Sequence, residues 1–382
     1  MKKHIILLSL LFFVGVENIS AQHIIKHPLR HVIYRCGLPK LDDYYCHPVD
    51  TIHPSDKPFG WNYSQRYGET DLNLPEKIFS GMMNSWAILL VQNDSIVYER
   101  YWKRNDTTDI FNSFSMAKTI TAILLGIAID EGKIGSVNDK VYKYLPHFSQ
   151  GMDTMLTIEH LLTMTSGLNW TERFTDFNSD VAMAFYSDTL EGLLETIHVV
   201  REPGKYWKYQ CGNTLLLGMI ISEATGMPLA QYAEEKLWKP LGAHHYALWT
   251  RDSNGITKAF CCYYATTRDF ALLGRLMLNK GKWNGKQIIP EDYFRKMITP
   301  VGDAQFGKRN YVDFYGYQTW LYPRDKQEHI YYFAGMYGQY IIIFPERNAV
   351  MVRNGRMLNQ LSIMRIPPDL PVYINFALRE LK

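Results

Sequence analysis

Two hydrophobic patterns alternate along the chain. Trp86–Gln92 and Ile96–Tyr98 are strand-like runs joined by the pair Asn93-Asp94, which predicts a β-hairpin. Strand-like runs return near the C-terminus, at Tyr315–Tyr322, Ile330–Phe333, Tyr340–Phe344 and Ala349–Val352. The pattern therefore predicts a sheet that takes strands from both ends of the sequence.

Helical patterns fill the region between these strands. The first runs from Ser115 to Glu131, ends at the stop signal Gly132, and places apolar residues on one face at Ile120, Ile123, Leu124, Ile127 and Ala128. Further helices are expected at Ile158–Met164, Leu190–Thr196, Leu215–Ala224, Leu229–Leu237, Arg268–Asn279 and Tyr373–Leu381. This order predicts an α+β fold with a mainly helical lobe inserted at roughly residues 132–260.

The first residues have the pattern of a bacterial secretory signal. Lys2 and Lys3 precede the apolar run Ile5–Val16, and small residues precede Gln22. The run has about 12 residues, against the ~20 that a membrane-spanning helix needs. We therefore expect a signal peptide at residues 1–21, a mature protein in the periplasm or outside the cell, and no transmembrane segment once the signal is removed.

Composition narrows the class of protein further. A chain of 382 residues with 47% apolar and 14% aromatic residues is typical of an ordered globular protein with one large two-lobed domain or two to three smaller ones. The balance of 41 Lys and Arg against 38 Asp and Glu does not indicate a basic surface for binding nucleic acid. We divide the mature chain into an N-terminal extension at 22–75 and a main domain at 76–382.

Cysteine and histidine usage adds two expectations. Five cysteines leave at least one thiol free, and Cys36 and Cys46 could pair in an oxidising compartment. Cys211, Cys261 and Cys262 lie in apolar or aromatic surroundings and are expected to be buried thiols. The 12 histidines are scattered, so neither a metal site nor a cofactor is expected.

The strongest candidate for chemistry is Ser115-Met116-Ala117-Lys118, at the start of the first helix. A spacing of three puts the serine hydroxyl and the lysine amine on one helix face, about one turn apart. Burial would help Lys118 lose its proton and act as a base toward Ser115. The spacing alone also suits a serine near a helix start with a solvated lysine beyond it. Metalloprotease, P-loop and α/β-hydrolase motifs are absent from the sequence.

The residues around this tetrad resemble the serine β-lactamase and penicillin-binding-protein superfamily. The similar segments, in the family's order, are Phe114–Ile120, Thr157–Leu168, Pro203-Gly204, Leu215–Gly218 and Pro240–Gly242. The resemblance covers roughly Trp86 to the C-terminus and is greatest to the class C β-lactamase-related, 6-aminohexanoate-dimer hydrolase type of esterase-amidase. It implies a β-lactamase and transpeptidase-like fold, an antiparallel sheet flanked by helices, with the active site between the sheet and the helical lobe.

The resemblance also implies a third catalytic residue. Tyr209 falls on the tyrosine of the family's Tyr-x-Asn motif and would shuttle protons together with Lys118. Cys211 stands at the position of the motif's asparagine, with Asn213 two residues later. This departure argues against recognition of a β-lactam amide.

The family's third motif, Lys or His-Thr-Gly, falls on Phe333-Ala334-Gly335. Gly335 would allow a ligand close to the backbone, and the backbone N–H groups of Ser115 and Met336 would form the oxyanion hole. An apolar ring at Phe333 cannot replace the cation that helps to bind a substrate carboxylate in the family, although a displaced arginine such as Arg353 could.

Two aromatic residues, Trp170 and Tyr337, are candidates for the wall of the cleft, with core packing as the alternative. Together these features predict an exported serine hydrolase that cleaves a small-molecule or peptide-like ester or amide through a Ser115 acyl-enzyme. The alternatives are a β-lactamase or D-alanyl-D-alanine carboxypeptidase acting on cell-wall peptide, and a catalytically silent binding or sensor module of the same fold.

Overall fold

A seven-stranded sheet is the centre of the computed structural model, which describes residues 39–69, 78–323, 328–357 and 366–381. Its strands lie in the order β10 (Trp320–Leu321), β11 (Tyr331–Gly335), β12 (Gln339–Phe344), β13 (Ala349–Gly355), β3 (Ser85–Gln92), β4 (Ser95–Tyr101) and β2 (Asn62–Tyr63). Neighbours pair antiparallel except β2, which runs parallel to β4. As the sequence predicts, both ends of the chain supply strands.

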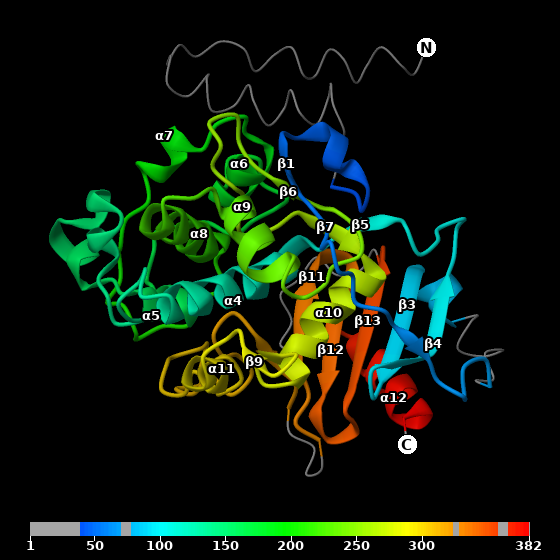
Figure 1. The fold of residues 1–382 in the computed structure, drawn as a ribbon. Coiled ribbons are helices and arrows are strands. Elements are labelled where there is room, and N and C mark those ends of the chain that lie inside the picture. Colours follow the sequence, from blue (N-terminus) through cyan, green and yellow to red (C-terminus); the bar gives the residue numbers. More distant parts are fainter. Residues whose placement is uncertain (1–38, 70–77, 324–327, 358–365, 382) are drawn as a thin grey trace, which may run out of the picture.

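Both faces of this sheet are buried, which explains its continuous apolar runs. Side chains alternate along a strand: Leu89 and Val91 of β3 pack in one cluster with helix α10 (Thr267–Leu278), and Ile88 and Leu90 pack in another with α12 (Leu370–Glu380). Figure 1 shows α10 across β12 and β13 on one face and α12 on the other. The sheet is therefore the middle layer of a three-layer sandwich.

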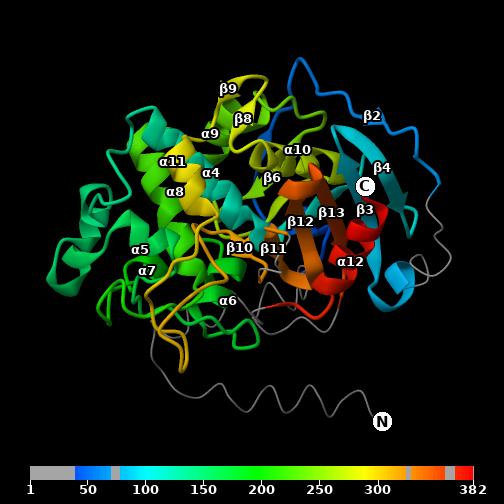
Figure 2. The same ribbon diagram turned by 90° about the horizontal axis from the view of Figure 1, so that it is seen from below.

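The helical lobe packs beside the sheet through helix α4 (Ala117–Asp130). Almost every residue of α4 is buried, from Ala117 to Ala128, as is typical of a core helix. The lobe contains α5 (Ile158–Leu162), α6 (Asp180–Tyr186), α7 (Glu191–Leu194), α8 (Cys211–Thr225) and α9 (Leu229–Ala233), while α11 (Glu291–Met297) and the hairpin β8 (Lys282–Trp283) and β9 (Lys286–Gln287) follow α10. Figure 2 shows the lobe and the sheet on opposite sides of α4.

A second, four-stranded sheet was not predicted. It has the order β1 (Val49–Ile52), β6 (Ala247–Thr250), β7 (Tyr263–Thr266) and β5 (Ile110–Asn112). Strand β1 belongs to the N-terminal extension, so part of that extension is built into the fold. These strands are three or four residues long and pair across long stretches of sequence, which leaves no local periodicity to detect.

Other expectations meet mixed outcomes. The strand expected at Tyr315–Tyr322 is reduced to Trp320–Leu321. Cys261 and Cys262 form a disulfide with each other rather than buried thiols, whereas Cys211 is a buried free thiol. Residues 1–21 and Cys36 lie outside the described residues, so the signal peptide and the Cys36–Cys46 pairing stay predictions. None of the helices in the described ranges combines the length and apolar character needed to cross a bilayer.

The close packing of α10 on the sheet gives a test of the fold. A Cβ added at Gly274 would overlap Val350 Cγ1 and come within 2.9 Å of Ile341 Cγ2. We expect Gly274→Ala to lower the free energy of unfolding by about 1–3 kcal/mol, because both strands must shift. The measurement is urea denaturation followed by circular dichroism.

The matched control is Gly192→Ala in the exposed helix α7, where no atom lies within 4 Å of the added Cβ. Alanine there should leave the free energy of unfolding unchanged or raise it by up to about 1 kcal/mol. Equal effects of the two substitutions would contradict the packing of α10 described above.

Candidate active site

Ser115 lies in a short 3₁₀ turn, Phe114–Met116, that leads from β5 into α4. Two hydrogen bonds fix this turn: Phe114 N donates to Asn112 Oδ1 at 2.8 Å, and Ser113 N donates to the Tyr263 carbonyl at 2.8 Å. Phe114 has a positive φ of 44°, a conformation that costs energy for a bulky residue. The turn leaves Ser115 partly exposed among buried neighbours.

Lys118 follows one turn later on the same face of the helix and is only 1% exposed. Its Nζ lies 3.0 Å from Ser115 Oγ and donates to the Phe260 carbonyl at 2.9 Å. The surface lysine that the spacing alone also allowed is therefore not found. Instead, the amine is held against the hydroxyl, in the range needed for direct proton transfer.

Tyr209 brings a phenol to the same place from the loop before α8. The Lys118 Nζ lies 5.0 Å from the centre of the Tyr209 ring, which stacks on Trp320 with centroids 5.7 Å apart. Burial raises the pKa of Tyr209 well above its usual 10, and a hydrogen bond with Ser115 partly opposes this rise. The phenol therefore carries its proton at neutral pH.

Strand β11 ends at Gly335 beside this turn, and Met336 follows directly. A Cβ at Gly335 would overlap the carbonyl oxygen of Ser113, so glycine lets the strand end pass directly against the backbone that precedes Ser115. Met336 is partly exposed. The structure thus brings Ser115, Lys118, Tyr209 and the Gly335-Met336 segment together.

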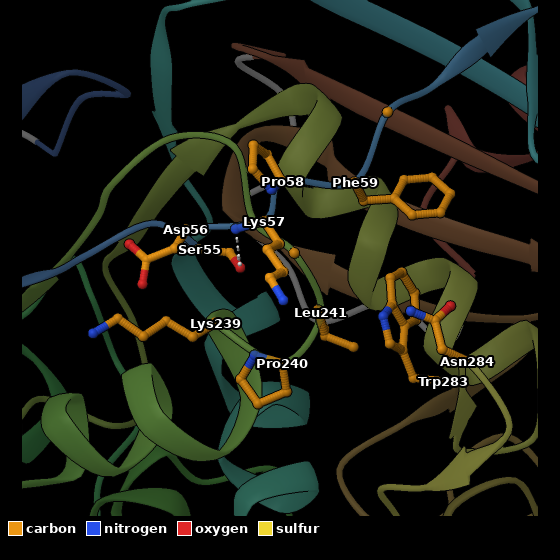
Figure 3. Close-up of a pocket in the computed structure, with 12 residues that line it drawn as sticks. Ser55, Asp56, Lys57, Pro58, Phe59, Lys239, Pro240, Leu241, Trp283 and Asn284 are labelled. Carbon is orange, nitrogen blue, oxygen red and sulfur yellow. Dashed lines mark hydrogen bonds between the residues drawn. The ribbon is translucent and has the colours of Figure 1, made fainter.

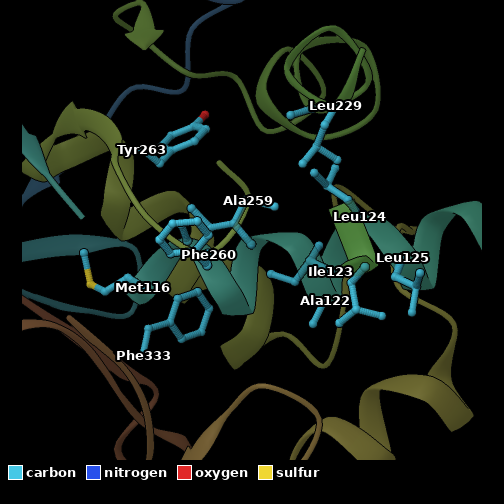
Figure 4. Packing of buried hydrophobic residues seen from close by; sticks show 14 of the residues in the cluster. Met116, Ala122, Ile123, Leu124, Leu125, Leu229, Ala259, Phe260, Tyr263 and Phe333 are labelled. Atoms are coloured by element: carbon cyan, nitrogen blue, oxygen red, sulfur yellow. The ribbon is translucent and has the colours of Figure 1, made fainter. Parts of the chain in front are cut away.

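Phe333 and Arg353 do not face a substrate. Phe333 is fully buried and packs near Met116 under the helix (Figure 4). Arg353 is also fully buried, and its guanidinium donates to the carbonyls of Tyr337, Gly338 and Met83. Arg353 therefore does not supply the displaced cation that the sequence left open, because its donors already hold the loop that follows Met336.

The two predicted wall residues are also buried. Trp170 is 0% exposed, and its ring packs where a Cβ of Gly212 would stand. Tyr337 is 7% exposed and clusters with Leu41 and Phe114. Of the two alternatives weighed from the sequence, core packing describes Trp170, because its ring has no exposed surface for a substrate to contact. Tyr337 directly follows Met336, which packs against the same cluster.

Glu172 belongs to the site but was not predicted. Its Oε2 accepts from Trp170 Nε1 at 2.7 Å and from the Cys211 backbone N–H at 2.8 Å, and its Oε1 accepts from Cys211 Sγ at 2.7 Å. Burial raises the pKa of this carboxyl, and the charge of Lys118 lowers it. No motif in the sequence marks Glu172; only its position two residues after Trp170 connects it with the site.

A cavity of about 560 Å³ lies elsewhere, between the N-terminal extension and the β8–β9 hairpin (Figure 3). It is lined by Ser55, Asp56, Lys57, Pro58, Phe59, Gly60, Lys239, Pro240, Leu241, Gly242, Trp283 and Asn284. Its Lys239 is paired with Glu234 at 2.6 Å. The cavity contains none of Ser115, Lys118 and Tyr209 and is separate from the candidate active site. The described residues include no cluster of three or more His, Cys, Asp or Glu able to hold a metal ion.

Comparisons with known proteins identify the family and the fold of the chain. The family model for β-lactamase matches residues 75–361. The 6-aminohexanoate-dimer hydrolase of Paenarthrobacter ureafaciens is 23% identical over 284 residues, 70% of this chain and 71% of that protein. A provisionally named penicillin-binding protein PbpX of Bacillus subtilis is 30% identical over 170 residues, 42% of this chain, and this match spans only 40% of that longer protein.

Among solved structures, a provisionally named 6-aminohexanoate-dimer hydrolase from Bacillus anthracis superimposes with a TM-score of 0.73. The alignment covers 88% of this chain and 92% of the other, at 22% sequence identity. A likeness at this identity shows the fold, which is the β-lactamase and transpeptidase-like fold that the sequence predicts. Because the family model also covers most of the sequence, the chain belongs to the β-lactamase family.

Proposed function

We propose that the protein is an exported serine hydrolase that cleaves an ester or amide bond through an acyl-enzyme on Ser115. The observation that carries this proposal is the contact of 3.0 Å between the buried Lys118 amine and the Ser115 hydroxyl, with the Tyr209 phenol beside both. Export rests on the signal-like pattern of residues 1–21 alone.

In the first step, the neutral Lys118 amine takes the Ser115 proton while Oγ bonds to the substrate carbonyl carbon. The negative charge moves to the carbonyl oxygen, where the backbone N–H groups of Ser115 and Met336 stabilise it. Tyr209 then donates its proton to the leaving alcohol or amine as the bond to carbon breaks, and the Lys118 ammonium returns a proton to Tyr209. Water then attacks the carbonyl carbon of the acyl-enzyme and gives up a proton to Lys118. The bond between this carbon and Ser115 Oγ breaks, and Ser115 takes a proton back.

The charge around the site favours a substrate without an obligatory carboxylate. Phe333 and Arg353 are both fully buried, and the arginine donates to backbone carbonyls. Neither side chain can therefore pair with a substrate anion. Esters and amides that need no carboxylate contact fit this arrangement better than β-lactams do.

One observation favours a β-lactam or D-alanyl-D-alanine peptide as the second candidate substrate. The guanidinium of Arg356 lies over the ring of Tyr337, 5.7 Å from the ring centre. Tyr337 is the residue that follows Met336. A substrate carboxylate could pair with this arginine from the oxyanion side of the site. Turnover of a chromogenic cephalosporin, with a KM that rises in Arg356→Gln, would support this second candidate over the first.

The nucleophile is tested with p-nitrophenyl esters of short acids and the chromogenic cephalosporin in parallel. Because Ser115 forms the acyl bond, Ser115→Ala should lower kcat/KM for the ester by about 10³-fold or more. The measurement is initial rates on the mature protein from Gln22, with urea denaturation to confirm that the variant folds. Equal ester hydrolysis by both proteins would contradict the acyl-enzyme, and inactivity toward both substrates would favour the silent binding module.

The proton donor is tested by Tyr209→Phe. We expect kcat to fall by about 10²- to 10⁴-fold with little change in KM, because the ring and its stacking on Trp320 remain while the proton is lost. The matched control is Tyr315→Phe, a buried phenol whose ring lies 6.4 Å from that of Tyr209. Similar losses in the two variants would show that packing, rather than proton donation, is the role of Tyr209.

A further inference from the structure

The N-terminal extension reaches the turn that carries Ser115. Leu41 and Asp43 of the extension are 0% and 1% exposed, and they lie against Asn112, the last residue of β5. The Asn112 backbone N–H donates to the Leu41 carbonyl at 2.9 Å. Asn112 is fully buried and stands three positions before Ser115, so this contact brings the extension to the start of the candidate active site.

We propose that Asn112 is a positioning residue of this serine hydrolase, held in place by Leu41 and Asp43 of the N-terminal extension. Its side-chain oxygen fixes the turn that presents Ser115 to Lys118. The inference rests on the proposed function, because it assigns a role in presenting the same nucleophile. It makes the extension a part of the active site.

The turn before Ser115 needs such a support. Phe114 has a positive φ of 44°, which is unfavourable for a bulky side chain. Its N–H donates to Asn112 Oδ1 at 2.8 Å, a bond that closes the kind of turn an asparagine side chain makes with the backbone two residues later. Without this acceptor, Phe114 would be free to relax toward negative φ. The Ser115 hydroxyl would move with it, because Ser115 is the next residue.

The direction of the Asn112 amide is fixed by its neighbours. An N–H group can only donate, so Oδ1 must face Phe114 and Nδ2 must face the opposite side. There Nδ2 donates to the Tyr264 hydroxyl at 3.0 Å, which donates to Asp43 Oδ1 at 2.7 Å, while Asp43 Oδ2 accepts from the Lys40 N–H at 2.9 Å. This order does not depend on the charge of Asp43, because a carboxylic acid keeps an oxygen that accepts. The extension therefore decides which end of the amide faces the turn.

Packing adds to these hydrogen bonds. Leu41 forms a buried cluster with Phe114 and Tyr337, whose rings meet edge to face with centroids 5.5 Å apart. The extension therefore contacts both the residue before Ser115 and the residue after Met336. The same contacts also allow a purely structural reading, in which they contribute stability alone, and the experiment must separate the two.

The test compares Asn112→Ala, which removes the acceptor, with Asn112→Ser, whose hydroxyl can accept from the N–H two residues later, though more weakly. The readouts are kcat and KM for a p-nitrophenyl ester and the rate at which a fluorophosphonate labels Ser115, a reaction in which Oγ bonds to phosphorus and fluoride leaves. For alanine we expect kcat and the labelling rate to fall about 10- to 100-fold, with KM within about threefold, because the hydroxyl is displaced from Lys118. Serine should recover part of this loss, and serine that does no better than alanine would overturn the proposal.

Asp43→Ala tests the role of the extension. The Asn112 oxygen remains, but the chain of hydrogen bonds that orients the amide loses its last acceptor. We therefore expect a smaller loss of kcat and labelling rate, about 3- to 10-fold. A wild-type labelling rate in Asp43→Ala would overturn the proposal. This variant and Asn112→Ser keep the proposal testable if Asn112→Ala does not fold.

The matched control is Asn354→Ala on β13. Asn354 is as fully buried as Asn112 and accepts from Thr267 Oγ1 at 2.9 Å. Alanine there should lower the free energy of unfolding and leave kcat and the labelling rate of the folded protein unchanged. An Asn112→Ala protein that matches this control in both respects would reduce Asn112 to a structural residue and overturn the proposal. Wild-type protein that is not labelled at Ser115 would instead overturn the proposed function, and the positioning role with it.

Discussion

Burial of the Lys118 amine is the constraint on which the site depends. An ammonium or amine cannot be taken from water into an apolar helix unless hydrogen bonds replace those it loses. Lys118 is 1% exposed, and its partners come from the turn before α4 and from Phe260, in the segment before β7. Their positions are therefore fixed relative to one another, and the Ser115 hydroxyl is held against the Lys118 amine before any substrate arrives.

The segment that supplies Phe260 also holds the rest of the helix start. Thr121 Oγ1 donates to the Ala259 carbonyl at 3.0 Å, and Ser113 N donates to the Tyr263 carbonyl at 2.8 Å. The Cys261–Cys262 disulfide lies between these contacts. Three backbone carbonyls of this segment thus accept hydrogen bonds from the turn before α4, from Lys118 and from the second turn of α4. Preorganisation of this kind is what a reaction by proton transfer needs.

Much of this could be predicted from the sequence because it depends on local pattern. The long strands of the main sheet and the helices α4, α8 and α10 have sustained apolar periods. Ser115 and Lys118 share a face because they are three positions apart. Tyr209 was predicted through its match to the Tyr-x-Asn motif, and it lies beside Lys118 although the two are distant in the sequence. The second sheet escaped prediction because its short strands pair across long sequence separations.

The residues that escaped prediction act through contacts that no local pattern records. Phe260 contributes a backbone carbonyl, so its side chain carries no signal. Glu172 reaches the site only because the segment after Trp170 folds against the first residue of α8. The disulfide of Cys261 and Cys262 joins neighbours that the apolar surroundings suggested as separate thiols. For Phe260 and Glu172, the deciding partner is distant in the sequence or belongs to the backbone.

Arg353 is a buried cation that binds backbone carbonyls of the protein itself. Its guanidinium is fully buried on β13 and donates to carbonyls of the loop after Met336. An arginine committed in this way cannot bind a substrate anion, since each of these donors is matched by a protein acceptor. It does stabilise the loop that follows Met336. An arginine used in this way makes the protein more rigid and leaves the recognition of any anion to other groups.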